Sequence, residues 1–254
     1  SLMPDGHRAH KASCLSGNRC NGVRVITNVE AVFFDLDDTL WAVTPVILRA
    51  ERKIYAYLQK NFPRLTDAMD PEAIRKVRSQ VYASRPDLAH DRTTSRRLAF
   101  ESLLSDFDYD PQAAVTLTDL FLDYRNRVAL YPDAIPALER LRNHFKLVVV
   151  TNGNADIERV GIGEFFSAQV RAEEAGCRKL VADIFRLACS SIDVEPSSVV
   201  HVGDHPIDDI QGAIGAGIRS VWINRHGETW TEAHHPDAEV ADLAGLVTLL
   251  RQAN

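Results

Sequence analysis

The segment VFFDLDDTLW, residues 32–41, ends an apolar run in three aspartates, Asp35, Asp37 and Asp38. Carboxylates this close repel one another, and the repulsion costs free energy unless a cation or a proton relieves it. Clustered carboxylate oxygens are also the hard ligands that Mg²⁺ prefers, and a carboxylate can attack a phosphoryl group to give an acyl-phosphate. The segment therefore indicates a magnesium site and a candidate nucleophile at the end of a buried strand.

Polar residues also follow the later apolar runs of the chain. Thr151 and Asn152 come directly after the second run, and Asp204 comes after the third, with Asp208 and Asp209 shortly behind it. A threonine hydroxyl with backbone N–H groups beside it can bind phosphoryl oxygens. Because ligand sites of open parallel sheets lie beyond the carboxyl ends of the strands, we expect these residues to meet the aspartates at one edge of a sheet.

A lysine completes the set of charges that phosphoryl transfer needs. Lys179 lies between the second and third runs, next to Arg178, and an ammonium group there adds a positive charge to a phosphate-binding site. Arg178 is the alternative source of that charge. One aspartate can be the nucleophile, and an aspartate two residues on, such as Asp37, can act as general acid and then as general base. Together these residues favour the hydrolysis of a phosphate ester.

The elements that must position these residues are predicted from the apolar runs. Continuous rather than alternating apolar runs are typical of parallel strands that helices cover on both faces. Helical patterns separate the runs, which predicts an α/β fold with a Rossmann-like, doubly wound parallel sheet. The predicted strands are residues 31–34, 147–150, 199–202 and 220–223.

The segment 42–130 contains only helical signals. An N-cap residue followed by proline marks a helix start, and residues 93–105 predict a further helix. The predicted starts are Thr44-Pro45, Asp70-Pro71 and Asp110-Pro111. We therefore predict a flexible N-terminal extension at 1–28, an α/β core of residues 29–41 and 131–254, and an all-helical cap domain at 42–130 inserted into the core.

The sequence resembles the haloacid dehalogenase superfamily over residues 30–235. Residues 35–39 (DLDDT) are similar to its DxDxT signature, and Thr151, Lys179 and residues 203–209 stand where its other three motifs lie, in the same order. A helical cap between the first and second motifs is also a feature of the superfamily. The stretches PVILRAER, TNGNADIE and HVGDHPIDDIQGAIGAGI are similar to phosphatases that act on flavin mononucleotide and on the phosphorylated pyrimidine precursor of riboflavin.

This resemblance implies a role for each residue of the site. Asp35 would be the nucleophile and a Mg²⁺ ligand, and Asp37 would be the acid/base, with its backbone carbonyl on the metal. Thr151, helped by Asn152, would hold the transferring phosphoryl group. Lys179 would neutralise charge on that group and on the nucleophile.

The last motif would complete the metal site. Asp204 would ligate Mg²⁺, and Asp209 would support the metal or Lys179, with Asp208 as the alternative. Leu180 stands where the family usually has a proline, which loosens the backbone beside the lysine. The resemblance thus implies a Mg²⁺-dependent phosphomonoester hydrolase that forms an aspartyl-phosphate. Its substrate would be a small organic phosphate, with a flavin or riboflavin-pathway phosphate as the candidate.

The cap would cover the site and select the substrate. We expect Trp41 to supply an apolar wall and Arg96 a cation or hydrogen-bond donor in a pocket between cap and core, although Arg96 in the basic run 92–97 fits a solvated helix face equally well. The alternative functions are haloacid dehalogenation, phosphomutase chemistry and an inactive binding protein. Dehalogenation has no leaving group that needs the proton of Asp37, and the complete set of site residues argues against an inactive protein.

Composition excludes other classes of function. A formal net charge of −6 argues against a wide basic face for nucleic acid. No apolar stretch approaches the length of a membrane span. The four cysteines show neither a CxxC pair nor zinc-ligand spacing, which is typical of reduced thiols in a cytoplasmic protein. The expected partner is a small phosphate ester, and the sequence leaves the oligomeric state open.

Overall fold

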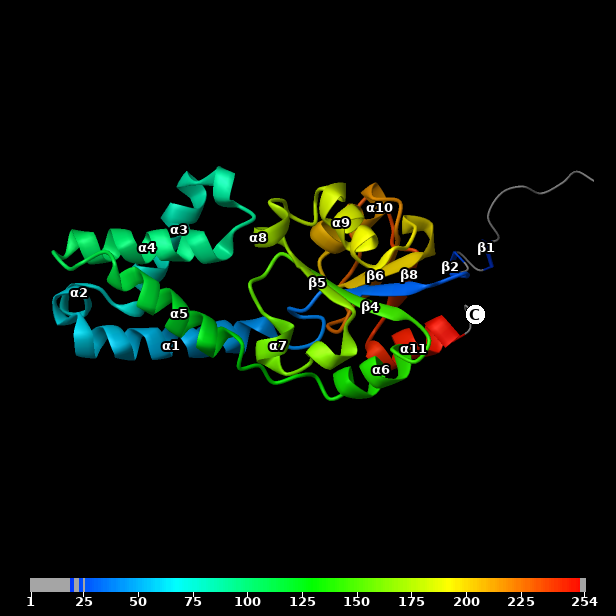
Figure 1. The fold of residues 1–254 in the computed structure, drawn as a ribbon, viewed down its shortest axis with the longest axis horizontal. Coiled ribbons are helices and arrows are strands. Elements are labelled where there is room, and N and C mark those ends of the chain that lie inside the picture. Colours follow the sequence, from blue (N-terminus) through cyan, green and yellow to red (C-terminus); the bar gives the residue numbers. More distant parts are fainter. Residues whose placement is uncertain (1–18, 21–22, 25, 252–254) are drawn as a thin grey trace, which may run out of the picture.

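The computed structural model describes residues 19–20, 23–24 and 26–251 (Figure 1). Within them, six parallel strands form one sheet in the order β5-β4-β3-β6-β7-β8, and β1 and β2 form a separate antiparallel pair. The strands are β1 (Arg19–Cys20), β2 (Val23–Arg24), β3 (Ala31–Phe34), β4 (Lys146–Thr151), β5 (Ala168–Arg171), β6 (Val199–Gly203), β7 (Arg219–Ile223) and β8 (Ala238–Val240). The predicted α/β fold class is confirmed, and the predicted extension at 1–28 falls largely outside the described residues.

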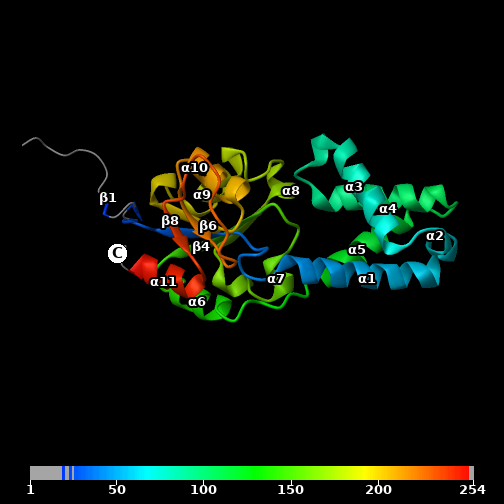
Figure 2. The same ribbon diagram turned by 180° about the vertical axis from the view of Figure 1, so that it is seen from behind.

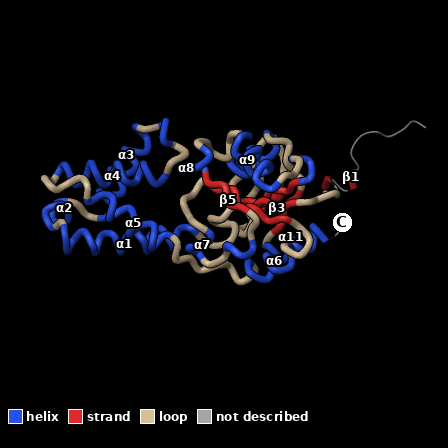
Figure 3. Tube along the Cα trace, viewed as in Figure 1, coloured by secondary structure: helices blue, strands red, loops and turns tan. Residues whose placement is uncertain are grey.

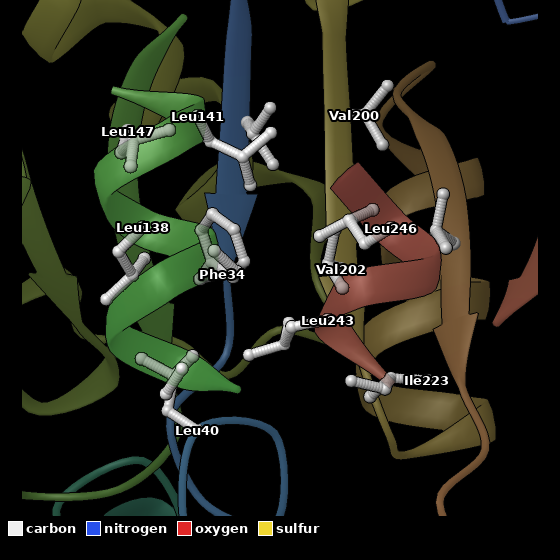
Figure 4. Packing of buried hydrophobic residues seen from close by; sticks show 14 of the residues in the cluster. Phe34, Leu40, Leu138, Leu141, Leu147, Val200, Val202, Ile223, Leu243 and Leu246 are labelled. Carbon is white, nitrogen blue, oxygen red and sulfur yellow. The ribbon is translucent and has the colours of Figure 1, made fainter. Parts of the chain in front are cut away.

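Helices cover both faces of the sheet (Figures 1 and 2). On one face α6 (Ala134–Leu141) and α11 (Leu243–Arg251) pack against the strands, and their leucines lie beside Phe34, Val200 and Val202 (Figure 4). On the other face lie α9 (Ala182–Ile192) and α10 (Gly212–Gly215). The central strands are therefore buried on both sides, which explains why their sequences are continuously apolar.

Between β3 and β4 the chain leaves the sheet and forms a helical lobe, which lies beside the sheet in Figures 1 and 3. The lobe has an apolar core of its own, in which Leu58, Leu103, Leu117 and Phe121 are buried. Helix α5 packs against both α1 and α4. The helices of the lobe are α1 (Val43–Asn61), α2 (Pro63–Ala68), α3 (Pro71–Ser84), α4 (Arg92–Asp106) and α5 (Ala113–Arg125).

Two connections that run side by side join the helical lobe to the sheet. Trp41 and Leu130 form an isolated antiparallel bridge, and the Tyr131 N–H donates to the Leu40 carbonyl at 2.8 Å. This pairing brings the start of α1 and the chain after α5 to the carboxyl edge of the sheet. The domain boundaries at 41/42 and 130/131 stay a prediction.

The elements differ from the sequence prediction at a few places. Helix α1 begins at Val43, one residue before the predicted start. Helix α5 begins at Ala113 instead of directly after Asp110, because the Asp110 side chain accepts from the Gln112 N–H at 2.9 Å in a turn that precedes the helix. The prediction for α3 is correct, since the Asp70 side chain accepts from the Ala73 N–H. Strands β5 and β8 were not predicted. Both are edge strands with partly exposed residues, so neither has a continuous apolar run.

The other described α-helices are the short segments α7 (Ile157–Val160) and α8 (Ala172–Ala175). A π-helical turn, Pro206–Gln211, follows β6 and carries two acidic residues in its first turn. Such turns are rare and are found mostly at functional sites. None of the described helices combines the length and the apolar character that crossing a membrane requires.

Candidate active site

The register of the sheet brings the sequence-predicted residues to one edge. Phe34 at the end of β3 lies opposite Val149 in β4 and Val202 in β6, so the residues that follow these strands emerge together. They line a cavity of about 170 Å³. Its walls are Asp35, Asp37, Asp38, Thr151, Asn152, Gly153, Lys179, Asp204, His205, Asp208 and Asp209.

Lys179 lies at the centre of the site and is only 2% exposed. Its Nζ atom donates to Asp35 Oδ1 at 2.6 Å and to Asp209 Oδ1 at 2.5 Å. The Asn152 side-chain oxygen accepts from the Lys179 backbone N–H at 2.8 Å and fixes the segment. Burial alone would lower the pKa of Lys179, but the two carboxylates raise it above its usual value, so the ammonium stays charged.

Asp209 is fully buried and acts as the anchor for this lysine. Besides the ammonium group, Asp209 Oδ1 lies 2.9 Å from Nε2 of His201, and Oδ2 accepts from the His205 backbone N–H at 2.9 Å. Burial alone would raise the pKa of Asp209, but Lys179 and His201 lower it below its usual range. A Cβ at Gly203 would stand 2.2 Å from the Asp209 carboxyl carbon, so only glycine leaves room for this side chain.

A cluster of carboxylates in this site could hold a metal ion. Single oxygens of Asp35, Asp204 and Asp209 lie within 4.8 Å of one another. Burial raises the pKa of Asp35 to about 7, because the attraction of Lys179 only partly offsets burial and the neighbouring aspartates. Burial and the charges of Asp35 and Asp209 raise the pKa of Asp204 to about 8. An all-oxygen, strongly anionic donor set fits a hard divalent cation, which would remove the repulsion within the cluster.

Asp37 faces the helical lobe. Its Oδ1 atom accepts from the Trp41 indole N–H at 3.0 Å, and Arg125 Nη2 donates to Oδ1 at 2.7 Å and to Oδ2 at 2.6 Å. Arg125 is the last residue of α5 and is 1% exposed. Its contact with the site was missed from the sequence, because an arginine at the end of an amphipathic helix usually faces solvent and favours the helix dipole there.

Asp38, the third aspartate of residues 32–41, stabilises the backbone turn before α1. Asp38 has φ 55°, in the left-handed region that few residues other than glycine, asparagine and aspartate adopt. Its Oδ1 atom accepts from the Val43 N–H at 2.9 Å, which satisfies a free donor at the start of α1. Asp38 therefore turns the chain away from the sheet and into the helical lobe.

The end of β4 and the segment that follows it offer the groups that the sequence assigns to phosphoryl binding. Thr151 is buried, and its Oγ1 accepts from the Gly153 N–H at 3.0 Å. A Cβ on Gly153 would stand 2.9 Å from Asp37 Oδ2, so any larger residue at this position would require the Asp37 side chain to shift. Asn152 is tied to Lys179 by its side chain, which leaves its role toward a substrate a prediction.

The sequence left Arg178 open as an alternative to Lys179, and Asp208 as an alternative to Asp209. Arg178 donates to Asp208 Oδ2 at 2.8 Å, in an ion pair beside the central group. Lys179, in contrast, contacts both Asp35 and Asp209. Leu180, which replaces the usual proline, is mostly exposed and leaves the lysine in place.

The prediction that Trp41 lines the cap pocket is wrong. Its side chain is fully buried in the apolar core, and its indole N–H is used by Asp37. Arg96 does not lie on a solvated helix face either. It is 8% exposed and lines a second cavity, whose wall includes Asp37, Asn152 and Gly153 of the first.

Comparisons with known proteins agree with this fold and these motifs. The curated 5-amino-6-(5-phospho-D-ribitylamino)uracil phosphatase YigB of Escherichia coli is 31% identical over 89% of this chain and 98% of its own length. The glyceraldehyde 3-phosphate phosphatase of Methanopyrus kandleri is 34% identical over 78% of this chain and 84% of its own.

A solved structure agrees as well. The structure described as a 2-haloacid dehalogenase from Pseudomonas syringae pv. Tomato DC3000 has a TM-score of 0.82 and 37% identity, and it covers 88% of this chain and 99% of its own. Residues 29–217 match the family model of the haloacid dehalogenase-like hydrolases. The family that the motifs predict is thus confirmed, and the chain belongs to the haloacid dehalogenase-like hydrolases.

Proposed function

We propose that this hydrolase is a Mg²⁺-dependent phosphomonoesterase that works through an aspartyl-phosphate on Asp35. The observation that carries the proposal is the ammonium group of Lys179 between Asp35 and Asp209, with Asp37 two residues after the nucleophile. The Lys179 ammonium group would hold the Asp35 carboxylate toward the cavity and neutralise charge on an incoming phosphate. The names of the curated relatives, which are phosphatases, support the same reaction.

In the first half-reaction, an Asp35 oxygen attacks phosphorus and the bond from phosphorus to the ester oxygen breaks. Asp37 donates a proton to the departing alkoxide, which leaves as an alcohol. Thr151 and the nearby backbone N–H groups would hold the phosphoryl oxygens during the transfer.

In the second half-reaction, Asp37 accepts a proton from a water molecule that attacks the phosphorus of the aspartyl-phosphate. The acyl-phosphate bond breaks, inorganic phosphate leaves and the Asp35 carboxylate is restored. Asp35, Asp204 and the backbone carbonyl of Asp37 would hold Mg²⁺, with support from Asp209. The bound ion supplies charge neutralisation between the carboxylates and the anionic substrate.

The proposed substrate is a small organic phosphate, and the first candidate is a riboflavin-pathway or flavin phosphate. The support for this candidate is the Escherichia coli relative, whose name states 5-amino-6-(5-phospho-D-ribitylamino)uracil as its substrate. A haloacid dehalogenase is the second candidate function, because the solved structure with 37% identity is described as one. Asp37 argues for the phosphatase, since only an ester leaving group needs its proton.

The test measures phosphate release from an aryl phosphate, from 5-amino-6-(5-phospho-D-ribitylamino)uracil and from flavin mononucleotide, with Mg²⁺ and with a chelator. Chloride release from 2-chloropropionate is measured in parallel. We expect Mg²⁺-dependent phosphate release and no chloride release, and we expect Asp35→Asn to abolish turnover while the circular dichroism spectrum is unchanged. Chloride release without phosphate release, or near-normal hydrolysis by Asp35→Asn, would overturn the proposal.

A further inference from the structure

A second cavity, of about 320 Å³, lies where the helical lobe meets the active site. Side chains of α1, α3, α4 and α5 form most of its wall. Asp37, Asn152 and Gly153 line both this cavity and the one around Asp35. An ester whose phosphate lies at Asp35 can therefore extend past Asp37 into the second cavity, which we name the cap cavity.

The wall of the cap cavity is strongly basic. Its described arginines are Arg78, Arg92, Arg96 and Arg125. Two of them are neutralised, since Arg78 pairs with Glu51 and Arg125 pairs with Asp37. The other two have aromatic partners instead. The guanidinium carbon of Arg92 lies 5.5 Å from the ring centre of Tyr82, and that of Arg96 lies 3.4 Å from the ring centre of Phe121.

Arg92 and Arg96 have no carboxylate partner within the described part of the chain. Arg96 is also buried, and its Nε atom has no hydrogen-bond partner among the described residues. Burial lowers the pKa of Arg96 to about 10, which leaves the side chain cationic at neutral pH. A buried cation without a counter-ion is unfavourable, and stacking on one ring offsets only a small part of that.

Arg125 adds a further donor to the same wall. Its Nη2 atom binds Asp37, while its buried Nη1 atom has no hydrogen-bond partner in the part of the chain that the structure describes. The cap cavity thus combines two cations without counter-ions and guanidinium nitrogens without acceptors. Arginines are well suited to carboxylates and phosphates because their planar fork can donate two parallel hydrogen bonds.

We propose that Arg92 and Arg96 form a subsite for a second anionic group of the substrate, a carboxylate or a phosphate, at the end remote from the ester phosphate. The inference rests on the proposed phosphatase function and deepens it by naming the substrate class. An uncharged ring, such as the uracil of the first candidate, would meet these arginines through its carbonyl oxygens alone. The subsite therefore ranks organic phosphates with a second negative charge above neutral ones of equal size.

The first experiment compares two esters that differ in one group. Sorbitol 6-phosphate and 6-phosphogluconate have the same chain of six carbons and the same phosphate, but one ends in CH₂OH and the other in a carboxylate. We expect kcat/KM to be roughly 10- to 100-fold higher for 6-phosphogluconate, the range that charge-assisted hydrogen bonds provide. Equal values, or a preference for sorbitol 6-phosphate, would overturn the subsite.

The second experiment asks whether the two arginines cause the preference. In Arg92→Gln and Arg96→Gln, the ratio of kcat/KM for 6-phosphogluconate to that for sorbitol 6-phosphate should fall about tenfold or more. Arg97→Gln is the matched control, because Arg97 is the next residue of α4, is exposed and pairs with Glu101. It should keep the ratio of the unchanged enzyme. A ratio that stays the same in both arginine variants, or falls as far in the control, contradicts the proposal.

Folding and catalysis are separated from the subsite by two further measurements. Arg96→Gln changes a buried residue, so Arg92→Gln, at a half-buried position, keeps the test valid if the first variant does not fold. Calorimetric titration of Asp35→Asn with both esters reads binding without turnover, and 6-phosphogluconate should bind at least tenfold more tightly. If no ester is hydrolysed, the proposed function fails while this titration still decides the subsite. If phosphate esters are hydrolysed but sorbitol 6-phosphate reacts as well as 6-phosphogluconate, the proposed function stands and the subsite is overturned.

Discussion

The guanidinium group of Arg125 donates to both carboxylate oxygens of Asp37, at 2.7 and 2.6 Å. Arg125 is the last residue of α5, the last helix of the helical lobe, whereas Asp37 follows β3, a central strand of the sheet. The contact therefore joins the helical lobe to the proposed acid/base. Because the Trp41 indole N–H also binds Asp37, the carboxylate is held from two sides.

Replacing Arg125 should weaken catalysis by releasing Asp37. In Arg125→Gln the two charge-assisted hydrogen bonds are lost, and Asp37 is free to leave the direction in which it reaches the ester oxygen. We expect kcat to fall about 10- to 100-fold, as displacements of catalytic groups by about 1 Å do. Steady-state kinetics with an alkyl phosphate provide the measurement. Arg127→Gln, which changes a nearby exposed arginine, is the control and should retain normal kcat.

Asp37→Asn should slow the reaction by an amount that depends on the leaving group. Loss of general acid catalysis lowers the rate by about 10²–10⁴-fold for an alkyl phosphate, whose alkoxide needs a proton. Aryl phosphates leave as weakly basic phenolates and should lose much less. A series of esters with leaving groups of different pKa gives the comparison, and an equal loss across the series would remove Asp37 from the acid role.

Lys179→Met should lower the stability of the folded protein as well as its activity. The substitution leaves Asp35 and Asp209 buried beside each other without the cation that both contact. Breaking a buried ion pair by removing one partner lowers the free energy of unfolding by about 3–5 kcal/mol. Urea unfolding followed by circular dichroism measures the difference. Lys146→Met, at an exposed lysine of β4, is the matched control and should change stability by about 1 kcal/mol or less.

The central strands could be predicted because the residues of each strand show by themselves that the strand is buried. Strands β3, β4, β6 and β7 are buried on both faces, so each is a continuous apolar run that contrasts with its polar flank. Strands β5 and β8 lie at the edges of the sheet, where partial exposure removes that contrast. Their existence follows from tertiary pairing with β4 and β7 rather than from their own sequence.

The residues of the site also divide into those that a local sequence pattern predicts and those that depend on tertiary packing. Asp35 and Asp204 directly follow central strands and Thr151 ends one, so the parallel register alone brings them together. The position of Arg125 depends instead on how α5 packs in the cap lobe, which no local pattern encodes. The burial of Trp41 depends on the core between the sheet, α6 and α11, and its proximity to the aspartates in sequence suggested a pocket wall where the structure has core.

Glu51 should make the stability of the cap lobe depend on pH. It accepts from Arg75 Nη2 at 3.1 Å and also pairs with Arg78, and its side chain is only 15% exposed. Although burial alone would raise the pKa of Glu51, the two arginines lower it below its usual value. A carboxyl group with a lowered pKa contributes stability above its unfolded pKa of about 4.3 and loses it as the pH falls through the folded value.

The Glu51→Gln variant tests this contribution. At pH 7 the free energy of unfolding of this variant should be about 1–3 kcal/mol lower than that of the unchanged protein, which is the range for hydrogen bonds to charged groups. The difference should shrink as the pH is lowered from about 5 to 3, because protonation then removes the same charge from the unchanged protein. Urea unfolding across this range gives the measurement, and Glu101→Gln, which changes a half-buried glutamate of α4 that pairs with Arg97, serves as control. A difference that grows toward low pH would show that Glu51 does not stabilise the lobe through its charge.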